Sequence, residues 1–172
     1  MNRKFLYFSV LIFAIFLVVF LFLFGGEAPR AESMTWGVNF SQKHAINLGL
    51  DWKETYLALL DDLGAKYLKI AVHWDYIEGN GPGLFFDDVD WQVKEAEKRN
   101  VKILFAIGMK TPRWPECHTP QWVKDLGKKD QQNAVLAMIS GIVSRYKDSP
   151  ALWAWQVENE PFFPFGDCPW VD

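Results

Sequence analysis

Several residue types that common functional sites require are scarce in this sequence. The 172-residue chain has two cysteines and three histidines, and His44, His73 and His118 do not have the spacing of metal ligands. No glycine-rich turn of the G-x-G-x-x-G or G-x-x-x-x-G-K type follows the first expected strand, so nucleotide binding lacks its usual support. The formal net charge of −3 gives no reason to expect a nucleic-acid partner. We infer no cofactor, no metal and no obligate protein partner.

The amino-terminal residues differ in composition from the rest of the chain. Residues 5–24 carry no charge and follow Arg3 and Lys4. A helix of this length spans about 30 Å, enough to cross a bilayer, and a buried core helix would normally show a polar face. We predict a signal anchor or signal peptide over residues 1–24 and a linker over 25–34. Because the positive charges precede the apolar run, the following domain is expected outside the cytoplasm, membrane-anchored or secreted if the signal is cleaved.

From Trp36 onward, short apolar segments alternate with amphipathic ones. The pattern predicts strands at 36–40, 67–74, 101–108 and 151–158, with helices at 50–64, 87–100 and 130–147. Asp51 is the expected cap of the first helix, Gly64 is expected to end it, and Asn100 is expected to end the second. Strands that alternate with helices indicate an α/β fold with a parallel sheet, either a (β/α)8 barrel or a doubly wound sheet. In both folds the functional groups lie at the carboxyl ends of the strands.

Two carboxylates and an amide close the fourth predicted strand. In the segment WQVENEP, Glu158, Asn159 and Glu160 end an apolar run, and Pro161 behind them helps to end strand pairing. Strict alternation puts Glu158 and Glu160 on one side of the strand and Asn159 on the other. Asn159 and Glu160 can therefore face one site only if the strand twists or ends there. The alternative without a function is a pair of solvated acids at a strand end.

This segment resembles the Asn-Glu-Pro motif that closes the fourth strand of retaining glycoside hydrolases of clan A, which are (β/α)8 TIM barrels. The resemblance covers residues 35–172 and includes WGVNFS on the first strand, HWDYIE after the second strand and TPRWPE after the third. The nearest likeness is to family 5, the cellulase and mannanase type, or its membrane-anchored bacterial relatives. One departure is Lys69, which stands where many family 5 members have an arginine.

The resemblance implies a role for each member of the motif. Glycoside hydrolysis with retention needs an acid that protonates the leaving oxygen and a carboxylate nucleophile roughly 5 Å away. By resemblance, Glu160 is that acid and later the base, and Asn159 bonds the sugar 2-hydroxyl. The acid must hold its proton near neutral pH, which requires burial or a neighbouring charge. Glu158 is the competitor for the acid role.

Further candidates for substrate binding follow the first three strands. Asn39 ends the first strand, and His73 and Trp74 end the second, so all three are expected to face a common mouth. Arg113 and Trp114 follow the third strand. Sugar rings present apolar C–H faces, so Trp74 and Trp114 are candidate sugar platforms, with packing as the alternative.

The two cysteines follow neighbouring strands in loops on the same face. We predict a disulfide between Cys117 and Cys168, since an exported domain lies where disulfides persist. It would tie the loop after the third strand to the loop after the fourth. Two free thiols are the alternative.

Together with the resemblance, the sequence indicates a membrane-anchored hydrolase of a β-linked poly- or oligosaccharide that uses a retaining double displacement. Residues 35–172 are expected to form the first four strands of a (β/α)8 barrel, the amino-terminal half, with the nucleophile absent from this chain. Such a fragment is expected to be inactive by itself. One alternative is a non-catalytic carbohydrate-binding protein on the same scaffold. Another is a four-stranded unit that closes a barrel by dimerising.

Overall fold

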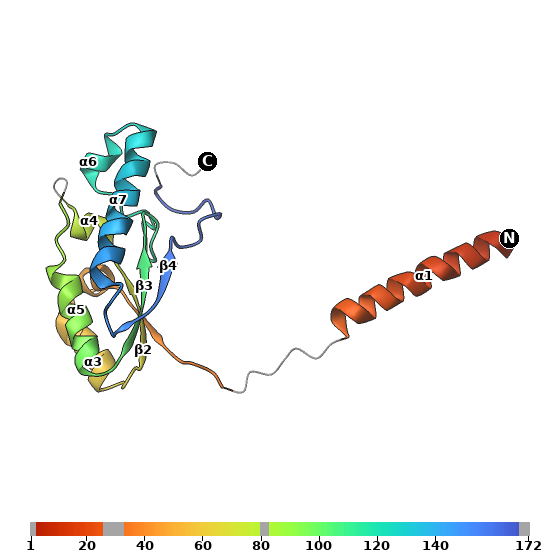
Figure 1. The fold of residues 1–172 in the computed structure, drawn as a ribbon, viewed down its shortest axis with the longest axis horizontal. Helices are drawn as coiled ribbons and strands as arrows, with labels where there is room; N and C mark the ends of the chain where they lie inside the picture. The colour runs from red at the N-terminus through yellow and green to blue at the C-terminus, as the bar shows by residue number, and fades with distance from the viewer. Residues whose placement is uncertain (1–2, 26–32, 80–82, 169–172) are drawn as a thin grey trace. The chain divides into compact units, whose positions relative to one another are not determined.

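The computed structural model describes residues 3–25, 33–79 and 83–168 of the chain. The chain divides into two compact units, Met1–Met34 and Thr35–Asp172. The first unit contains α1 (Arg3–Phe24), drawn in red in Figure 1. Its segment Tyr7–Phe24 has a mean hydropathy of 3.0, and it is the one helix in the described part of the chain long and apolar enough to cross a membrane. Most of the predicted linker lies outside the described residues.

The second unit is built on a parallel sheet in which the strands follow their order in the sequence. These strands are β1 (Val38–Phe40), β2 (Tyr67–Ala71), β3 (Lys102–Ile107) and β4 (Leu152–Val157). A doubly wound sheet reverses its strand order at a switch point, whereas a barrel adds each strand beside the last. The order β1-β2-β3-β4 is therefore that of a barrel, of which these strands form a part.

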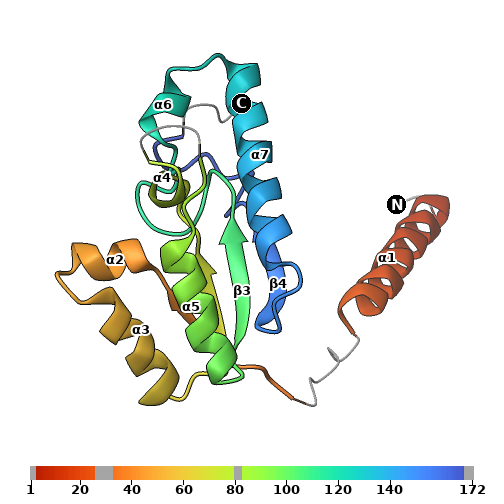
Figure 2. The same cartoon turned by 60° about the vertical axis from the view of Figure 1, so that its left-hand side comes forward.

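Three helices of at least ten residues connect the strands and cover one face of the sheet (Figures 1 and 2). They are α3 (Trp52–Asp61), α5 (Asp87–Lys98) and α7 (Lys128–Tyr146). The Asp51 side chain caps α3 by accepting hydrogen bonds from the amides of Lys53 and Glu54. The chain leaves α3 through Gly64 and α5 through Asn100, both with positive φ, as expected for residues that tolerate the left-handed conformation.

Three short helices follow β1, β2 and β3 and were not predicted: α2 (Gln42–Asn47), α4 (Trp74–Ile77) and α6 (Gln121–Lys124). The strand predicted at 67–74 accordingly ends at Ala71. The reason lies in α4, where the amide of Asp75 donates to the carbonyl oxygen of His118. This bond satisfies one of the free amides at the helix start, and it draws α4 against the loop after β3.

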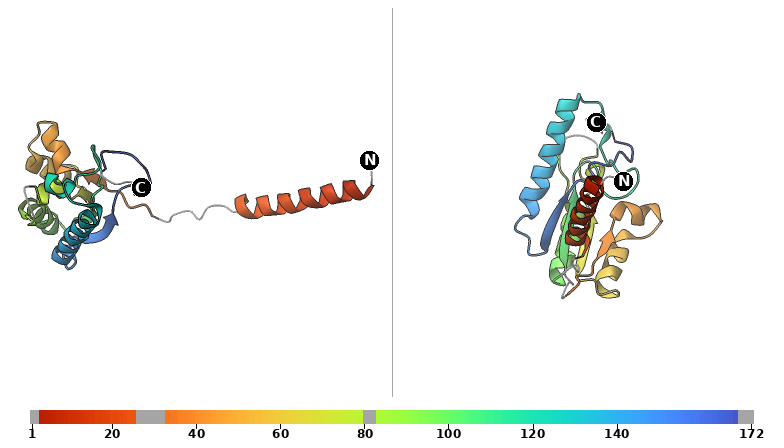
Figure 3. Two further views of the ribbon diagram at one scale, coloured as in Figure 1. Left: turned by 90° about the horizontal axis from the view of Figure 1, so that it is seen from above. Right: turned by 90° about the vertical axis from the view of Figure 1, so that its right-hand side faces the viewer.

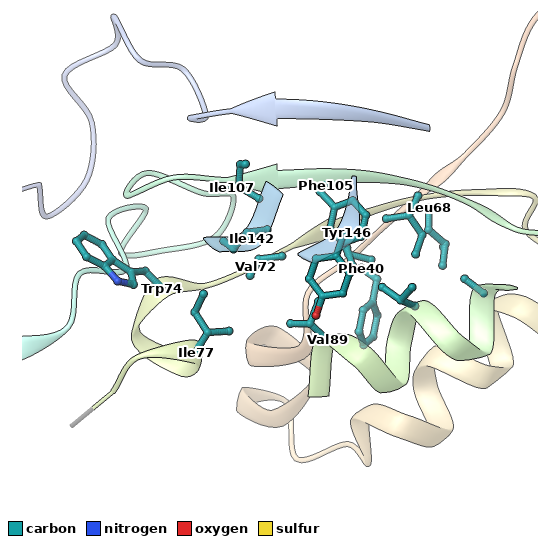
Figure 4. Packing of buried hydrophobic residues seen from close by; sticks show 14 of the residues in the cluster. Phe40, Leu68, Val72, Trp74, Ile77, Val89, Phe105, Ile107, Ile142 and Tyr146 are labelled. Atoms are coloured by element: carbon teal, nitrogen blue, oxygen red, sulfur yellow. The ribbon is translucent and has the colours of Figure 1, made fainter. Parts of the chain in front are cut away.

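The core lies between the sheet and its helices. Alternate strand residues point toward the helices and are almost fully buried, among them Leu68, Ile70, Ile103, Phe105 and Ile107. Figure 4 shows this side of the sheet, where Phe105 and Tyr146 meet with ring centroids 5.3 Å apart. Burial of a large apolar side chain stabilises a fold by about 1.5–3 kcal/mol, so this layer accounts for most of the favourable burial in the domain.

The opposite face of the sheet is only partly covered by the residues that the structure describes. Tyr67, Lys69 and Ala71 alternate with the buried residues of β2 and are half-buried. Trp153 lies on this face against Tyr67, with ring centroids 5.0 Å apart, whereas Trp155 stacks on Phe105. A register shift between β3 and β4 at Ile103 and Leu104 accompanies this change of side. Within the second unit, the left view in Figure 3 shows the helices on one side of the sheet.

Candidate active site

The carboxyl ends of the four strands carry the loops that hold the predicted site. β3 and β4 both point toward the same end of the domain, where the segments after them approach each other (Figure 1). The loop after β3 runs from Gly108 to His118, and the loop after β4 runs from Glu158 to Cys168. Asp167 of the second loop donates its amide to the carbonyl oxygen of Pro115 in the first. The predicted acid and its neighbours therefore lie on two loops in mutual contact.

The alternation of β4 stops where the motif begins. β4 ends at Val157, and the amide of Glu158 still bonds the carbonyl oxygen of Ile107 at 2.8 Å. Glu158 and Glu160 then take φ values of 62° and 49°. Two left-handed residues redirect the chain, so the alternation of an extended strand no longer decides which way Asn159 and Glu160 face.

Glu158 has a structural role, because its carboxylate is bound by backbone amides. Its carboxylate accepts hydrogen bonds from the amides of Met109 at 2.9 Å and Lys110 at 2.5 Å. These bonds fasten the start of the loop after β4 to the end of β3. Gly108 makes this contact possible, because an added Cβ would overlap the Glu158 carboxylate. Burial raises the pKa of Glu158, and the two amides act against that shift.

Glu160 has the opposite character. Its side chain is exposed, and among the described residues its carboxylate has no hydrogen-bond or ion-pair partner. Asn159 lies between these extremes: its amide group receives a bond from Gln156 and donates one to the carboxylate of Glu116 at 3.3 Å. Of the two acids in the motif, Glu160 is the one that is available to a ligand.

A disulfide joins the two loops in the structure. Cys117 and Cys168, which are 51 positions apart in sequence, are bonded, with Cα atoms 5.0 Å apart. Cys117 also pairs with Lys110 in an antiparallel bridge. The loop after β3 is thus closed on itself and fastened to the loop after β4.

His73 is part of a buried polar network and is not open to solvent. Its ring nitrogens lie 3.1 Å from the hydroxyls of Ser41 and Thr111, and its ring packs against that of His118 with centroids 4.0 Å apart. Burial, with help from His118 and Lys43, lowers the pKa of His73 to about 2. The prediction that His73 faces the mouth is wrong in this structure, because both polar atoms of the ring are used to join three loops.

His118 completes this network. Its Nδ1 lies 3.1 Å from Lys43 Nζ, and its Nε2 lies 3.0 Å from the carbonyl oxygen of Arg113. A lysine can only donate, so Nδ1 accepts and Nε2 carries the proton. Burial lowers the pKa of His118 to about 4, which keeps the ring neutral. Lys43 also forms an ion pair with Asp75.

Trp74 is likewise not a sugar platform. The residue is fully buried, and its indole N–H donates to the carboxylate of Glu78 at 2.7 Å. Figure 4 shows its ring at one end of the buried cluster, at the start of α4. The prediction failed because β2 ends three residues earlier than expected, which turns Trp74 from the mouth toward the core.

The remaining candidates stay at the mouth. Asn39 and Arg113 line a cavity of about 110 Å³ together with Lys69, which lies on the uncovered face of β2. Burial lowers the pKa of Lys69. Trp114 is 65% exposed, and its ring meets that of Phe165, with centroids 5.8 Å apart. The structure thus brings Asn39 and Arg113 together, and it places Trp114 beside the loop that carries Glu160.

Sequence reasoning missed Lys110 and Glu116, which contact the motif directly. Lys110 Nζ donates to the carbonyl oxygens of Glu160 and Phe163. Both residues lie in the loop after β3, whose path depends on turns that no periodic pattern announces. The only hint in the sequence was the presence of charged residues in this short loop, directly after an apolar strand. No cluster of metal-ligating side chains occurs among the described residues.

No family model matches this sequence. A probable mannan endo-1,4-β-mannosidase A-1 of Aspergillus terreus is 58% identical over 83 residues, which cover 42% of this chain and 21% of that protein. Mannan endo-1,4-β-mannosidase F of Aspergillus fumigatus is 33% identical over 81 residues, covering 42% of this chain and 18% of that protein. The chain thus spans about a fifth of the length of these curated relatives.

Solved structures share the fold. A β-galactosidase from Halorubrum lacusprofundi superposes with a TM-score of 0.56 at 19% identity, covering 74% of this chain and 21% of that one. A GH5_18 protein from Bifidobacterium longum gives the same TM-score and identity, covering 74% of this chain and 34% of that one. The predicted partial TIM-barrel fold is confirmed. Part of the chain is therefore similar in sequence to mannan endo-1,4-β-mannosidases, in agreement with the mannanase type that the motif indicated.

Proposed function

We propose that this chain carries the acid/base half of the active site of a retaining glycoside hydrolase that acts on β-linked glycans. One observation carries the proposal. Glu160, in the Asn-Glu-Pro segment, is an exposed carboxylate at the carboxyl end of a barrel strand and has no partner among the described residues, whereas the carboxylate of Glu158 is bound by two backbone amides. The mannan endo-1,4-β-mannosidase names of the curated relatives support a β-1,4-mannan as the first substrate to test.

In this proposal Glu160 acts twice. It first donates its proton to the leaving glycosidic oxygen while a second carboxylate attacks the anomeric carbon and forms a glycosyl-enzyme. It then takes a proton from the water that releases the sugar. Asn159 holds the 2-hydroxyl, Asn39 and Arg113 contact polar sugar groups, and Trp114 offers a flat apolar surface. We assign the nucleophile to no residue of 35–172, so the mechanism requires a carboxylate from a strand that completes the barrel.

The test compares the two acids of the motif in the intact protein. We expect Glu160→Gln to keep the melting temperature and to lower kcat/KM on an unactivated β-mannan by about 10²–10⁴-fold, since general acid catalysis contributes that much. An aryl glycoside with a good leaving group needs less protonation, so its glycosylation step should change less. The anomer first released by the wild-type protein should have the β configuration, as retention demands.

Glu158→Gln is the matched control for this test. Its amide cannot accept from both backbone N–H groups, so we expect stability to fall by about 1–3 kcal/mol. We expect the loss of turnover in the folded fraction to be smaller than in Glu160→Gln, because the proton donor is still present. Near-normal hydrolysis of mannan by Glu160→Gln would contradict the assignment. Glycan binding by the wild-type protein with no turnover on any β-glycan would support the carbohydrate-binding alternative.

We further propose that residues 5–24 hold the domain at a membrane, on the side away from the cytoplasm. The uncharged residues 5–24 of α1 support the anchor, and the bond between Cys117 and Cys168 supports an oxidising compartment. Carbonate washing of isolated membranes should leave the protein in the pellet, and thiol labelling before reduction should leave both cysteines unmodified. Release of the domain as a shorter soluble species would indicate a cleaved signal instead.

A further inference from the structure

Lys110 is buried beneath the proposed acid and has no role in the mechanism above. The residue is only 4% exposed, and it follows β3 at the point where the sheet ends. Its ammonium group donates to two carbonyl oxygens, those of Glu160 at 3.1 Å and Phe163 at 2.6 Å. Among the described residues no carboxylate forms an ion pair with it. Burying a charged ammonium group costs desolvation free energy, which hydrogen bonds to carbonyl oxygens offset only in part. This cost suggests that the contacts of Lys110 have a function.

The backbone of Lys110 grips the same segment. Its amide donates to the Glu158 carboxylate at 2.5 Å, and its carbonyl oxygen accepts from the amide of Asn159 at 2.7 Å. Lys110 therefore contacts three consecutive residues of the motif and Phe163 beyond them. The ammonium group also lies 5.9 Å from the centroid of the Phe163 ring, in a cation–π contact.

The segment that Lys110 contacts needs external support. Glu158 and Glu160 both have positive φ, a conformation that costs a non-glycine residue about 1–3 kcal/mol. The residues that follow, from Pro161 to Phe165, are exposed and have little packing to hold them. The bond to the Glu160 carbonyl oxygen acts on the residue whose side chain is to be aimed, because a fixed carbonyl orients its peptide plane and the Cα–Cβ direction with it.

We propose that Lys110 is a positioning residue for Glu160. It holds the left-handed turn at 158–160 so that the exposed carboxyl points toward the leaving oxygen, although Lys110 itself touches no substrate. This inference rests on the proposed function of Glu160. Proton transfer requires the donor and acceptor atoms to lie about 2.6–3.2 Å apart, and a misplacement of about 1 Å can cost about 100-fold in rate.

Lys110→Met in the intact protein tests the inference, because methionine keeps the apolar stem and removes the three donors. We expect kcat/KM on an unactivated β-1,4-manno-oligosaccharide to fall by about 100-fold. We expect a loss below about 5-fold on an aryl β-mannoside with a good leaving group, which draws little on the acid. Lys110→Arg, which restores donors to the two carbonyl oxygens, should recover part of the lost rate on the oligosaccharide.

Lys102→Met is the matched control. Lys102 lies at the other end of β3, where its ammonium group donates to the Pro150 carbonyl oxygen at 2.7 Å and also joins β3 to the start of β4. Its removal should leave both rates and their ratio unchanged. Equal losses on the two substrates in Lys110→Met would overturn the positioning role, because a merely structural effect lowers the amount of active protein and does not depend on the leaving group.

Amide hydrogen exchange provides a readout that does not depend on turnover. Lys110→Met should speed exchange in residues 158–165 while leaving β2 and α5 protected. If the wild-type protein hydrolyses no β-glycan, the proposed function fails by itself, and exchange alone then decides whether Lys110 holds the segment. Unchanged exchange in residues 158–165 would overturn the inference in either case.

Discussion

At the amino end of the sheet the chain reverses through Gly64 and Asn100, residue types that accept a positive φ at little cost. At the carboxyl end it uses residue types that do not accept it readily: Arg113, Glu116, Glu158 and Glu160. The first end joins helices to strands through caps and turns of ordinary chemistry. The second end keeps unfavourable backbone conformations side by side with a disulfide and several buried polar contacts.

The strained backbone conformations lie at the carboxyl end of the sheet, and specific contacts keep them in place. Left-handed conformations of non-glycine residues persist only when their surroundings fix them, and they cluster at sites where geometry serves a function. At this carboxyl end the fixing contacts are identifiable. Glu158 bonds two amides, Lys110 bonds two carbonyl oxygens, and Cys117 is bonded to Cys168. At the amino end, glycine and asparagine tolerate a positive φ, so such contacts are not required.

Acid pH should lower the free energy of unfolding through the two buried histidines at the carboxyl end of the sheet. In the folded state the pKa of His73 is lowered to about 2 and that of His118 to about 4, while an unfolded histidine has a pKa near 6.5. Between pH 6.5 and about 4 the unfolded state thus binds more protons, so stability falls as the pH falls. From pH 7 to pH 5 we expect a loss of about 2 kcal/mol per histidine, measured by urea unfolding at each pH.

Substitution separates the histidines from other titrating groups. Lys43, Asp75 and Arg113 are the charged groups nearest the pair, and Glu158 acts with the opposite sign because its raised pKa lowers stability as the pH rises. His118→Asn keeps a donor and an acceptor but cannot titrate, so its pH dependence should be shallower by about half. Equal slopes in the variant and the wild type would mean that the histidines do not set the acid limit.

The periodic parts of the chain were predictable from the sequence, because they follow from local rules. The apolar strands and the caps at Asp51, Gly64 and Asn100 come from hydrophobic spacing and backbone preference, and the strand order then decided between the two sheet types. The helix α4 was not predictable, since its formation depends on a bond from Asp75 to the distant His118. Because α4 was not predicted, Trp74 and His73 were wrongly expected at the mouth of the site.

The site was predictable only where a motif marks it. The Asn-Glu-Pro segment pointed to Glu160 by resemblance, and the choice against Glu158 gained physical support only from the amides that bind Glu158. The charge of Lys110 in the loop after β3 gave no indication that the residue is buried, because a lysine after a strand normally lies in solvent. Its burial results from two loops that meet in space, which spacing along the chain does not encode.

Glycine-to-alanine substitutions at Gly108 and Gly64 compare the stability of the two ends of the sheet. We expect the losses to be smaller than the combined loss from the two histidines at acid pH. Gly108 has a φ of 124°, and an added Cβ would overlap the Glu158 carboxylate. Gly64 has a φ of 68° with nothing within 4 Å of an added Cβ. We expect Gly64→Ala to lose about 1 kcal/mol from backbone strain alone. Gly108→Ala should lose about 3 kcal/mol, because it also displaces Glu158 from its two amides.

Urea unfolding of the two variants at neutral pH measures this difference. The excess loss in Gly108→Ala, about 2 kcal/mol, combines the lost contact between β3 and the motif with the greater strain of alanine at a φ of 124° than at 68°. Adding Glu158→Gln to each variant makes the assignment specific. In the Gly64→Ala background the two losses should add, since the sites are distant, whereas in the Gly108→Ala background the second loss should shrink, because the bonds that Glu158 makes are already broken. Additive losses in both backgrounds would mean that Gly108 is required for its backbone conformation alone.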